Sequence, residues 1–171
     1  MHLGGSFALG PWRVRRTGCG AMQLAGDGVF GPPRDRDEAL KVLRAVAQTE
    51  IVCVQNLFNM ADQRSRDVLA ECTARSIAFV PFCPLGLPGE GRRRLLTDPV
   101  LAAVAARLGA MPVQVALAWL LGLAPNILLI PGTRTRAHLA ENLAAADVRL
   151  DDAARADLAR RFPAARAAPI G

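Results

Sequence analysis

Apolar runs and amphipathic stretches alternate along this sequence. Two short apolar runs around a Gly-Pro break predict a hairpin over residues 5–15, and residues 14–20 follow as a short strand entering a glycine-rich loop. Apolar runs rich in β-branched residues predict buried strands over 51–60, 77–86 and 127–132. Helical spacing of apolar residues predicts helices over 35–48, 63–75, 98–108, 112–122, 133–145 and 151–162, with a loop over 84–94.

The order of these elements indicates the fold class. A hairpin is followed by four strand–helix units, and such alternation is typical of parallel strands joined by right-handed crossovers. No low-complexity linker divides the chain, so residues 1–171 are expected to form a single α/β domain. Thr133 or Thr135 could cap the helix after the last strand, and Asp35 opens the first helix.

Composition and charge narrow the classes of function. Apolar residues make up 51% and charged residues 21% of the 171 positions, as in ordinary globular proteins. The net charge of +6 is carried by 20 Arg and the single Lys41, and the Arg residues are spread along the chain. Nucleic-acid-binding modules add aromatic residues to a basic stripe, but aromatics make up only 5% here. We therefore expect no nucleic-acid partner.

The sequence shows no sign of membrane insertion, export or metal binding. The longest apolar stretch, residues 113–124, is too short to span a bilayer, and the N-terminus lacks the pattern of a signal peptide. Cys19, Cys53, Cys72 and Cys83 form no CxxC pair, which favours buried free thiols in a reducing cytoplasm. The two His and four scattered Cys have no ligand spacing, so no metal site is expected.

Four motifs resemble one known family. GCGAMQLAGDGVFGPPRDRDEAL resembles the opening of aldo-keto reductases, which comprises the first barrel strand, a substrate-side loop and the first helix. VCVQNLFNMADQ and VPFCPLG resemble the sixth and seventh strands of that family. PVQVALAWLLGLAPNILLIPGTRTRAHLAENLAAADVRL resembles the seventh helix, the eighth strand and the cofactor-binding helix, and it is the most specific match.

The resemblance implies an internally truncated member of that family. A complete barrel of eight strand–helix units takes about 250 residues, whereas this chain passes from the first helix directly to the sixth-strand motif. The absent second to fifth strands carry the family's catalytic Asp, Tyr, Lys and His. There is no Tyr in the chain, and Lys41, His2 and His138 match none of the catalytic positions. A conventional reductase activity is therefore not expected.

Part of the family's cofactor site remains by resemblance, although the Ser-Asn pair after the fifth strand is absent. Gln55 would face the nicotinamide amide, and Phe82 would stack on the ring. Cys83, Leu85 and Gly86 would line the pyrophosphate strap. The adenosine phosphate would lie near Gly132, Thr133, Arg134 and His138, and the adenine near Glu141 and Asn142. The resemblance thus implies an NADP(H) site. The alternative is that these residues remain only because they hold the fold, and that no cofactor is required.

Half a barrel leaves two sheet edges open, and such edges invite pairing. A two-fold homodimer could close two (βα)4 halves into one eight-stranded barrel, with residues 127–132 of one subunit beside residues 14–20 of the other. The shared mouth would be mostly apolar and would suit an apolar small-molecule ligand. Candidate mouth residues are Cys19, Met22, Gln23, Asp27, Gln55, Asn56, Phe58, Asn59, Phe82 and Arg134.

The main candidates for chemistry are Asp27, Gln55 and Cys83. Asp27, the only carboxylate of the first loop, could act as an acid or base. Cys83 or Cys19 could act as a nucleophile. Gln55 and Asn59 could hold a carbonyl or enol by hydrogen bonds. We favour a non-redox biosynthetic enzyme that cyclises, dehydrates, hydrolyses or isomerises an apolar metabolite. An NADP(H)-dependent oxidoreductase with substitute catalytic residues and a non-catalytic binding protein are the alternatives.

Overall fold

The computed structural model describes residues 6–9, 11–15, 33, 35–46 and 51–164. The chain divides into two compact units, Met1–Val52 and Cys53–Gly171, which are described separately. The expected single domain over residues 1–171 stays a prediction. The predicted strand over residues 14–20 lies largely outside the described residues, as does the loop that follows it, and Val14 and Arg15 belong to the hairpin.

The first unit contains the predicted hairpin and the first helix. Strands β1 (Ser6–Leu9) and β2 (Trp12–Arg15) pair antiparallel around the Gly-Pro break. Helix α1 (Arg36–Val46) begins after Asp35, whose Oδ1 accepts a hydrogen bond from the Glu38 backbone N–H at 2.9 Å. Both elements are confirmed where the pattern placed them.

The second unit contains a small parallel sheet. Strands β3 (Cys53–Leu57) and β4 (Ala78–Phe82) pair in parallel, with Val54 opposite Phe79. Helix α2 (Arg66–Ala74) connects them and buries Leu69 and Cys72. The predicted strands and the predicted helix are confirmed, but Val68, expected on the same helix face, is exposed.

Two predicted elements differ in the structure. Residues 127–132 form no strand, because only Ile127 bridges to Phe79, and the chain beyond it has too little pairing to count as sheet. The loop predicted over 84–94 contains helix α3 (Glu90–Leu96). This helix is stabilised by ion pairs from Glu90 to the two arginines three and four positions later, and by the burial of Leu95.

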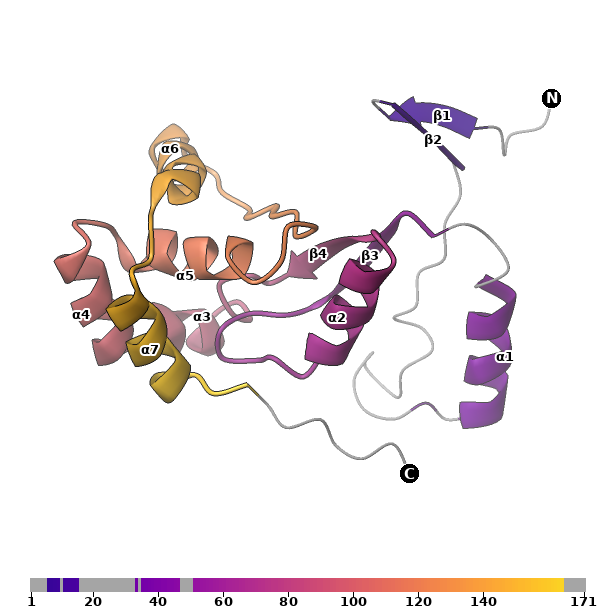
Figure 1. The fold of residues 1–171 in the computed structure, drawn as a ribbon, viewed down its shortest axis with the longest axis horizontal. Helices are drawn as coiled ribbons and strands as arrows, with labels where there is room; N and C mark the ends of the chain where they lie inside the picture. Colours follow the sequence, from indigo (N-terminus) through magenta and orange to yellow (C-terminus); the bar gives the residue numbers. More distant parts are fainter. Residues whose placement is uncertain (1–5, 10, 16–32, 34, 47–50, 165–171) are drawn as a thin grey trace. The chain divides into compact units, whose positions relative to one another are not determined.

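The C-terminal helices follow the predicted order (Figure 1). They are α4 (Pro99–Arg107), α5 (Pro112–Leu121), α6 (Arg136–Ala144), the 3₁₀ turn η3 (Ala145–Asp147) and α7 (Asp152–Arg161). Side chains of Asp98, Thr135 and Asp151 accept hydrogen bonds from the first turns of α4, α6 and α7. Thr135 rather than Thr133 is therefore the cap of α6.

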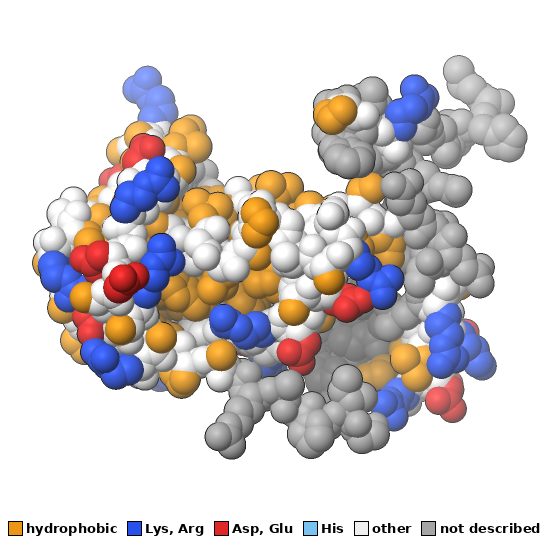
Figure 2. Space-filling model, in the orientation of Figure 1, with side chains coloured by type: hydrophobic (Ala, Val, Ile, Leu, Met, Phe, Trp, Pro, Cys, Tyr) orange, Lys and Arg blue, Asp and Glu red, His pale blue; other side chains and the backbone are white. Residues whose placement is uncertain are grey.

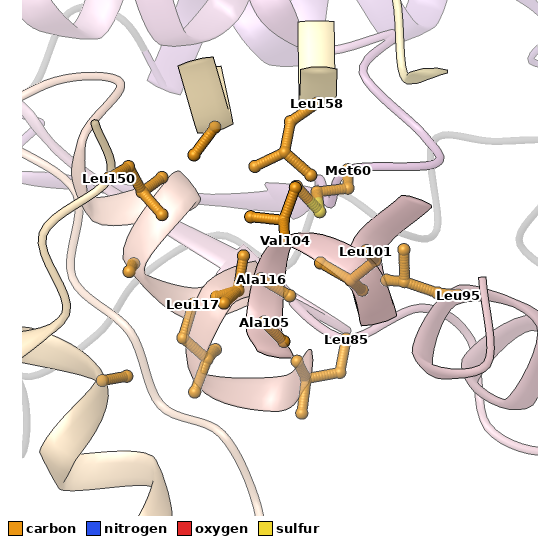
Figure 3. Packing of buried hydrophobic residues seen from close by; sticks show 14 residues of the cluster. Met60, Leu85, Leu95, Leu101, Val104, Ala105, Ala116, Leu117, Leu150 and Leu158 are labelled. Carbon is orange, nitrogen blue, oxygen red and sulfur yellow. The ribbon is translucent and has the colours of Figure 1, made fainter. Parts of the chain in front are cut away.

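Two apolar clusters form the core of the second unit, and α5 contributes to both. The larger cluster packs α3, α4, α5, η3 and α7 together, with Leu101, Leu117 and Leu158 fully enclosed (Figure 3). The smaller cluster lies between the sheet and α2 and contains Phe58 and Phe79. Because α5 is apolar on all sides, it can fill both clusters at once.

Among the described residues, no single helix is long and apolar enough to cross a membrane. Helices α4 and α5 reach the necessary length and apolar character only together, as a pair bent by 88°. The mixed helix and strand content agrees with the predicted α/β class. The complete (βα)4 half-barrel and its closure by a second copy stay predictions, because the described sheet of this unit has two strands.

Candidate cofactor and substrate site

The ends of β3 and β4 are tied together by the buried side chain of Asn59. Its Nδ2 donates to the Cys83 carbonyl oxygen at 3.2 Å, and its Oδ1 accepts from the backbone N–H groups of Ala61 and Asp62 at 3.0 and 2.9 Å. Only 2% of Asn59 is exposed. The side chain therefore fixes the two loops that leave the strands' carboxyl ends, where parallel α/β folds place their sites.

The loop after β4 is a tight turn that needs glycine. Cys83 has a φ of 52° and accepts a hydrogen bond from the Gly86 backbone N–H at 2.9 Å. Gly86 has a φ of 88°, and a Cβ there would lie 3.0 Å from the Gly91 carbonyl oxygen. Leu85 points into the large core cluster and is 4% exposed. The turn is thus anchored on one side and closely packed against α3 on the other.

Gln55 and Phe82 lie on the opposite side of the sheet from the smaller core cluster. Gln55 alternates with Val54, which packs into that cluster, so its side chain points away from it and is exposed. Phe82 is the last residue of β4 and is half-buried beside Leu57 of β3. This position suits contact with a ligand more than support of the core.

The first turn of α6 carries the second group of predicted residues. Thr135 Oγ1 accepts from the His138 backbone N–H at 3.2 Å, and Thr133 Oγ1 accepts from the Thr135 backbone N–H at 3.2 Å. Arg134 and Arg136 are both exposed beside this turn. Arg136 was missed in the sequence interpretation, although the Thr-Arg-Thr-Arg repeat was the available signal. Hydroxyls, guanidinium groups and a helix N-terminus together form an anion-attracting surface.

Helix α6 is positioned by α5. Gln114 Nε2 donates to the Glu141 carbonyl oxygen at 3.2 Å, while its Oε1 accepts from the Met111 backbone N–H. Glu141 and Asn142 are half-buried on α6, and α6 buries no side chain completely. The predicted residues thus form a strand-end group (Gln55, Asn59, Phe82 and the turn from Cys83 to Gly86) and an α6 group (Thr133, Arg134, His138, Glu141 and Asn142). The described contacts do not join these two groups to each other.

Several predicted site residues lie elsewhere or cannot be placed. Asp27, Met22, Gln23 and Cys19 are outside the described residues. Phe58 is fully buried, with its ring 5.8 Å from that of Phe79 in an edge-on contact and stacked 6.5 Å from Trp119. Phe58 therefore stabilises the core, and its part in a substrate pocket stays a prediction.

The described thiols are free but are not all buried, which corrects the sequence expectation. Cys72 is buried, Cys83 is half-buried and Cys53 is exposed, because Cys53 starts the outer strand β3 on the side facing away from the core. Partial desolvation raises the pKa of both Cys53 and Cys72. Among the described residues, no three His, Cys, Asp or Glu side chains are arranged to hold a metal ion.

Asp62 and Arg64 form an ion pair in the loop after β3. Arg64 donates two hydrogen bonds to Asp62 and holds the pKa of that carboxyl below its usual range, with burial opposing the shift. Over residues 53–164, Arg side chains are scattered on the visible face, whereas hydrophobic side chains gather across its middle (Figure 2).

The comparisons with known proteins give a consistent result. The model of the aldo/keto reductase family matches residues 35–160. Pyridoxine 4-dehydrogenase of Escherichia coli is 50% identical over 115 residues, which are 66% of this chain and 37% of that enzyme. An uncharacterised oxidoreductase of Schizosaccharomyces pombe is 38% identical over 100 residues, 58% of this chain and 31% of that protein. The chain thus spans about a third of the length of these relatives.

Comparison with solved structures also finds aldo/keto reductases. An aldo/keto reductase from Klebsiella pneumoniae, in complex with NADP and acetate, has a TM-score of 0.66 and 26% identity over 74% of this chain and 46% of that one. A second from the same organism, in complex with NADPH, has a TM-score of 0.62 over 87% of this chain and 57% of that one; at 22% identity it supports the fold alone.

Proposed function

Because the chain belongs to the aldo/keto reductase family, we propose that it binds NADP(H) and places the adenosine phosphate at the first turn of α6. The observation that carries this proposal is the exposed cluster of Thr133, Arg134 and Arg136 around a helix N-terminus capped by Thr135. Three features attract a phosphate there: N–H groups without helical partners, the positive end of the helix dipole and two guanidinium groups.

The strand-end group supplies the other half of the proposed site. Gln55 and Phe82 would contact the nicotinamide, and the turn from Cys83 to Gly86 would pass close to the pyrophosphate. The residues present fit such a ligand, since Gln55 is exposed, Phe82 is half-buried, and the turn is held rigidly by Asn59. When bound, the cofactor would supply hydride transfer, as it does in oxidoreductases generally.

The same chain carries no Tyr, so a proton donor to a carbonyl would have to come from a substitute residue or a partner chain. This absence favours a second candidate function, the non-redox conversion of an apolar metabolite by cyclisation, dehydration, hydrolysis or isomerisation. The half-buried apolar residues Leu57 and Phe82 on one side of the sheet support such a ligand. Asp27, Gln55 and Cys83 are the side chains that we propose for its chemistry.

We also propose that the protein works in a reducing compartment such as the cytoplasm, because the described cysteines are free thiols.

Cofactor binding is tested by calorimetric titration with NADPH and NADH. We expect NADPH to bind and Arg134→Ala to weaken it about tenfold or more, because a guanidinium–phosphate hydrogen bond contributes about 1.5–3 kcal/mol. The matched control is Arg149→Ala, which removes another exposed arginine, beyond the far end of α6. NADH, which lacks the extra phosphate, should lose little affinity in either variant.

Three outcomes separate the candidates. NADPH binding with the expected arginine dependence and with carbonyl turnover would support an oxidoreductase. The same binding without turnover would point to a non-catalytic binding protein. No saturable NADPH binding, or an equal loss in the Arg149 variant, would contradict the cofactor proposal and leave the non-redox function as the candidate to pursue.

A further inference from the structure

Helix α6, which carries the proposed phosphate site, has few packing contacts. Among the described helices of the second unit, it alone buries no side chain completely. Residues 136–140 are all exposed, and Leu143 is 67% exposed. The main contacts of α6 are with α5 and with η3, which continues from its C-terminal end. Apolar packing within the described residues therefore contributes little to the position of this helix, and polar contacts become important.

Within the described part of the chain, one hydrogen bond joins α6 to another helix. Gln114 Nε2, on the first turn of α5, donates to the Glu141 carbonyl oxygen at 3.2 Å. This carbonyl is available because the helix tightens here into the 3₁₀ turn η3. The Ala145 backbone N–H, which would bond to Glu141 in a continuing α-helix, bonds to the Asn142 carbonyl instead. Gln114 thus supplies the donor that the change of helix type removes.

The same side-chain amide also serves the start of α5. Gln114 is the third residue of that helix, and its Oε1 accepts from the Met111 backbone N–H at 2.9 Å. The oxygen atom therefore satisfies α5 and the nitrogen atom holds α6. A carboxylate at this position can accept hydrogen bonds but cannot donate one. Gln114→Glu therefore separates the two roles.

The hydrogen bond from Gln114 fixes the C-terminal half of α6, and the phosphate site lies at the other end. Ala145, directly after the helix, is buried in the larger core cluster. Because α6 is a single regular helix of nine residues, the placement of Glu141 and Ala145 sets where its first turn points. That turn follows Arg134, the residue proposed to bind the adenosine phosphate.

We propose that Gln114 is a positioning residue for the phosphate site, because its hydrogen bond to Glu141 holds α6 where Arg134 can meet the adenosine phosphate. This role rests on the proposed function, which assigns the phosphate to that turn. Gln114 acts only through α6 and does not touch the cofactor itself. Its loss should therefore weaken the binding of NADPH, whereas NADH, which lacks the extra phosphate, should be little affected.

Calorimetric titration of three variants tests this role. Gln114→Glu should raise the NADPH dissociation constant about threefold to tenfold, as expected for one lost hydrogen bond, and should change that of NADH by less than about twofold. Gln114→Ala, which removes both hydrogen bonds without adding charge, should weaken NADPH to a similar extent. The matched control is Met111→Glu, which adds the same negative charge at an exposed position of the same turn and keeps Gln114. It should bind NADPH as the wild type does.

A double-mutant cycle shows whether Gln114 acts through the phosphate site. In the Arg134→Ala background, Gln114→Glu should change the NADPH dissociation constant by less than about twofold, because the contact that it positions is already lost. Hydrogen–deuterium exchange without nucleotide gives a readout that does not depend on the cofactor. Exchange over residues 139–144 should be about threefold or more faster in Gln114→Glu, while α7 should be unchanged. Circular dichroism verifies that each variant folds.

The outcomes separate this role from cofactor binding itself. Wild-type NADPH affinity in Gln114→Glu, an equal loss in Met111→Glu, or the same loss with and without Arg134 would each overturn the proposal. If the wild-type chain binds no NADPH, the proposed function fails, and exchange in α6 alone decides the role of Gln114. Faster exchange in Gln114→Glu would then support the positioning of α6 by this residue, and unchanged exchange would overturn it.

Discussion

Replacement of Asn59 by Ala tests whether one buried amide holds the two strand ends together. The variant loses three hydrogen bonds, one to the Cys83 carbonyl and two from the backbone N–H groups of Ala61 and Asp62. The Cys83 carbonyl keeps its bond from Gly86, and the Asp62 N–H keeps its bond to the Asn59 carbonyl. These two groups therefore keep a partner, and the N–H of the exposed Ala61 can turn to water, so the net cost is about 1 kcal/mol for each lost bond.

The expected loss in the free energy of unfolding is therefore about 3 kcal/mol, or roughly 6–12 °C in the melting temperature of a chain of this size. Asn59→Asp keeps both acceptor bonds but buries a carboxylate against the Cys83 carbonyl oxygen, and we expect a loss of about 3 kcal/mol or more at neutral pH. Asn56→Ala is the control, because the Asn56 side chain accepts only from the adjacent Leu57 N–H and should cost about 1 kcal/mol or less.

Urea unfolding followed by far-ultraviolet circular dichroism measures all three variants. Both Asn59 variants should lose clearly more free energy of unfolding than Asn56→Ala. A loss below about 0.5 kcal/mol for Asn59→Ala would refute the view that this side chain fixes the loops after β3 and β4.

Three further predictions follow from other contacts. Gly86→Ala should cost about 2 kcal/mol of unfolding free energy, because φ at this position is 88° and the added Cβ meets backbone at 3.0 Å; a thermal melt unchanged from wild type would contradict this. Asp98→Ala should lower the unfolding free energy by about 2–3 kcal/mol, because it loses both the cap of α4 and the ion pair with Arg161. Asp98→Asn should lower it by about 1 kcal/mol, because the Asn side chain still caps the helix. The pKa of Asp62 is lowered in the folded state, so its pairing with Arg64 stabilises the protein above the ordinary aspartate range and is lost as the pH falls through the lowered pKa. The unfolding free energies of wild type and Asp62→Asn should therefore converge as the pH falls through the acidic range, from a difference under about 1 kcal/mol because Arg64 is largely solvated.

The sequence predicted best the elements whose signals are local. The helices α4, α6 and α7 each begin at a side chain that caps its own first turn, so Asp98, Thr135 and Asp151 mark their starts in the sequence itself. The core strand β4 is marked by its continuous apolar run. Helix α3 was missed because its glycine and three arginines suggest a loop, and only the pairing with Glu90 and the burial of Leu95 favour the helix.

The elements that depend on distant partners were predicted less well. The segment 127–132 has the composition of a strand, yet a strand needs a neighbour along its length, and Ile127 alone finds one. In the candidate site, too, the roles that depend on distant contacts were not predicted. The resemblance located Thr133 and Arg134 at a helix N-terminus, as the structure confirms. It could not reveal that Phe58 is core or that Asn59 bonds to a residue 24 positions away, because those roles depend on how β3 and β4 pack.

Hydrogen–deuterium exchange with and without NADPH reports both whether the cofactor binds and where it binds. We expect NADPH to slow exchange in the first turn of α6 around Arg134 and in the turn from Cys83 to Gly86, while α7 exchanges at the same rate in both samples. Unchanged exchange at saturating NADPH, or protection confined to other helices, would overturn the proposal that this chain binds the cofactor at these two places.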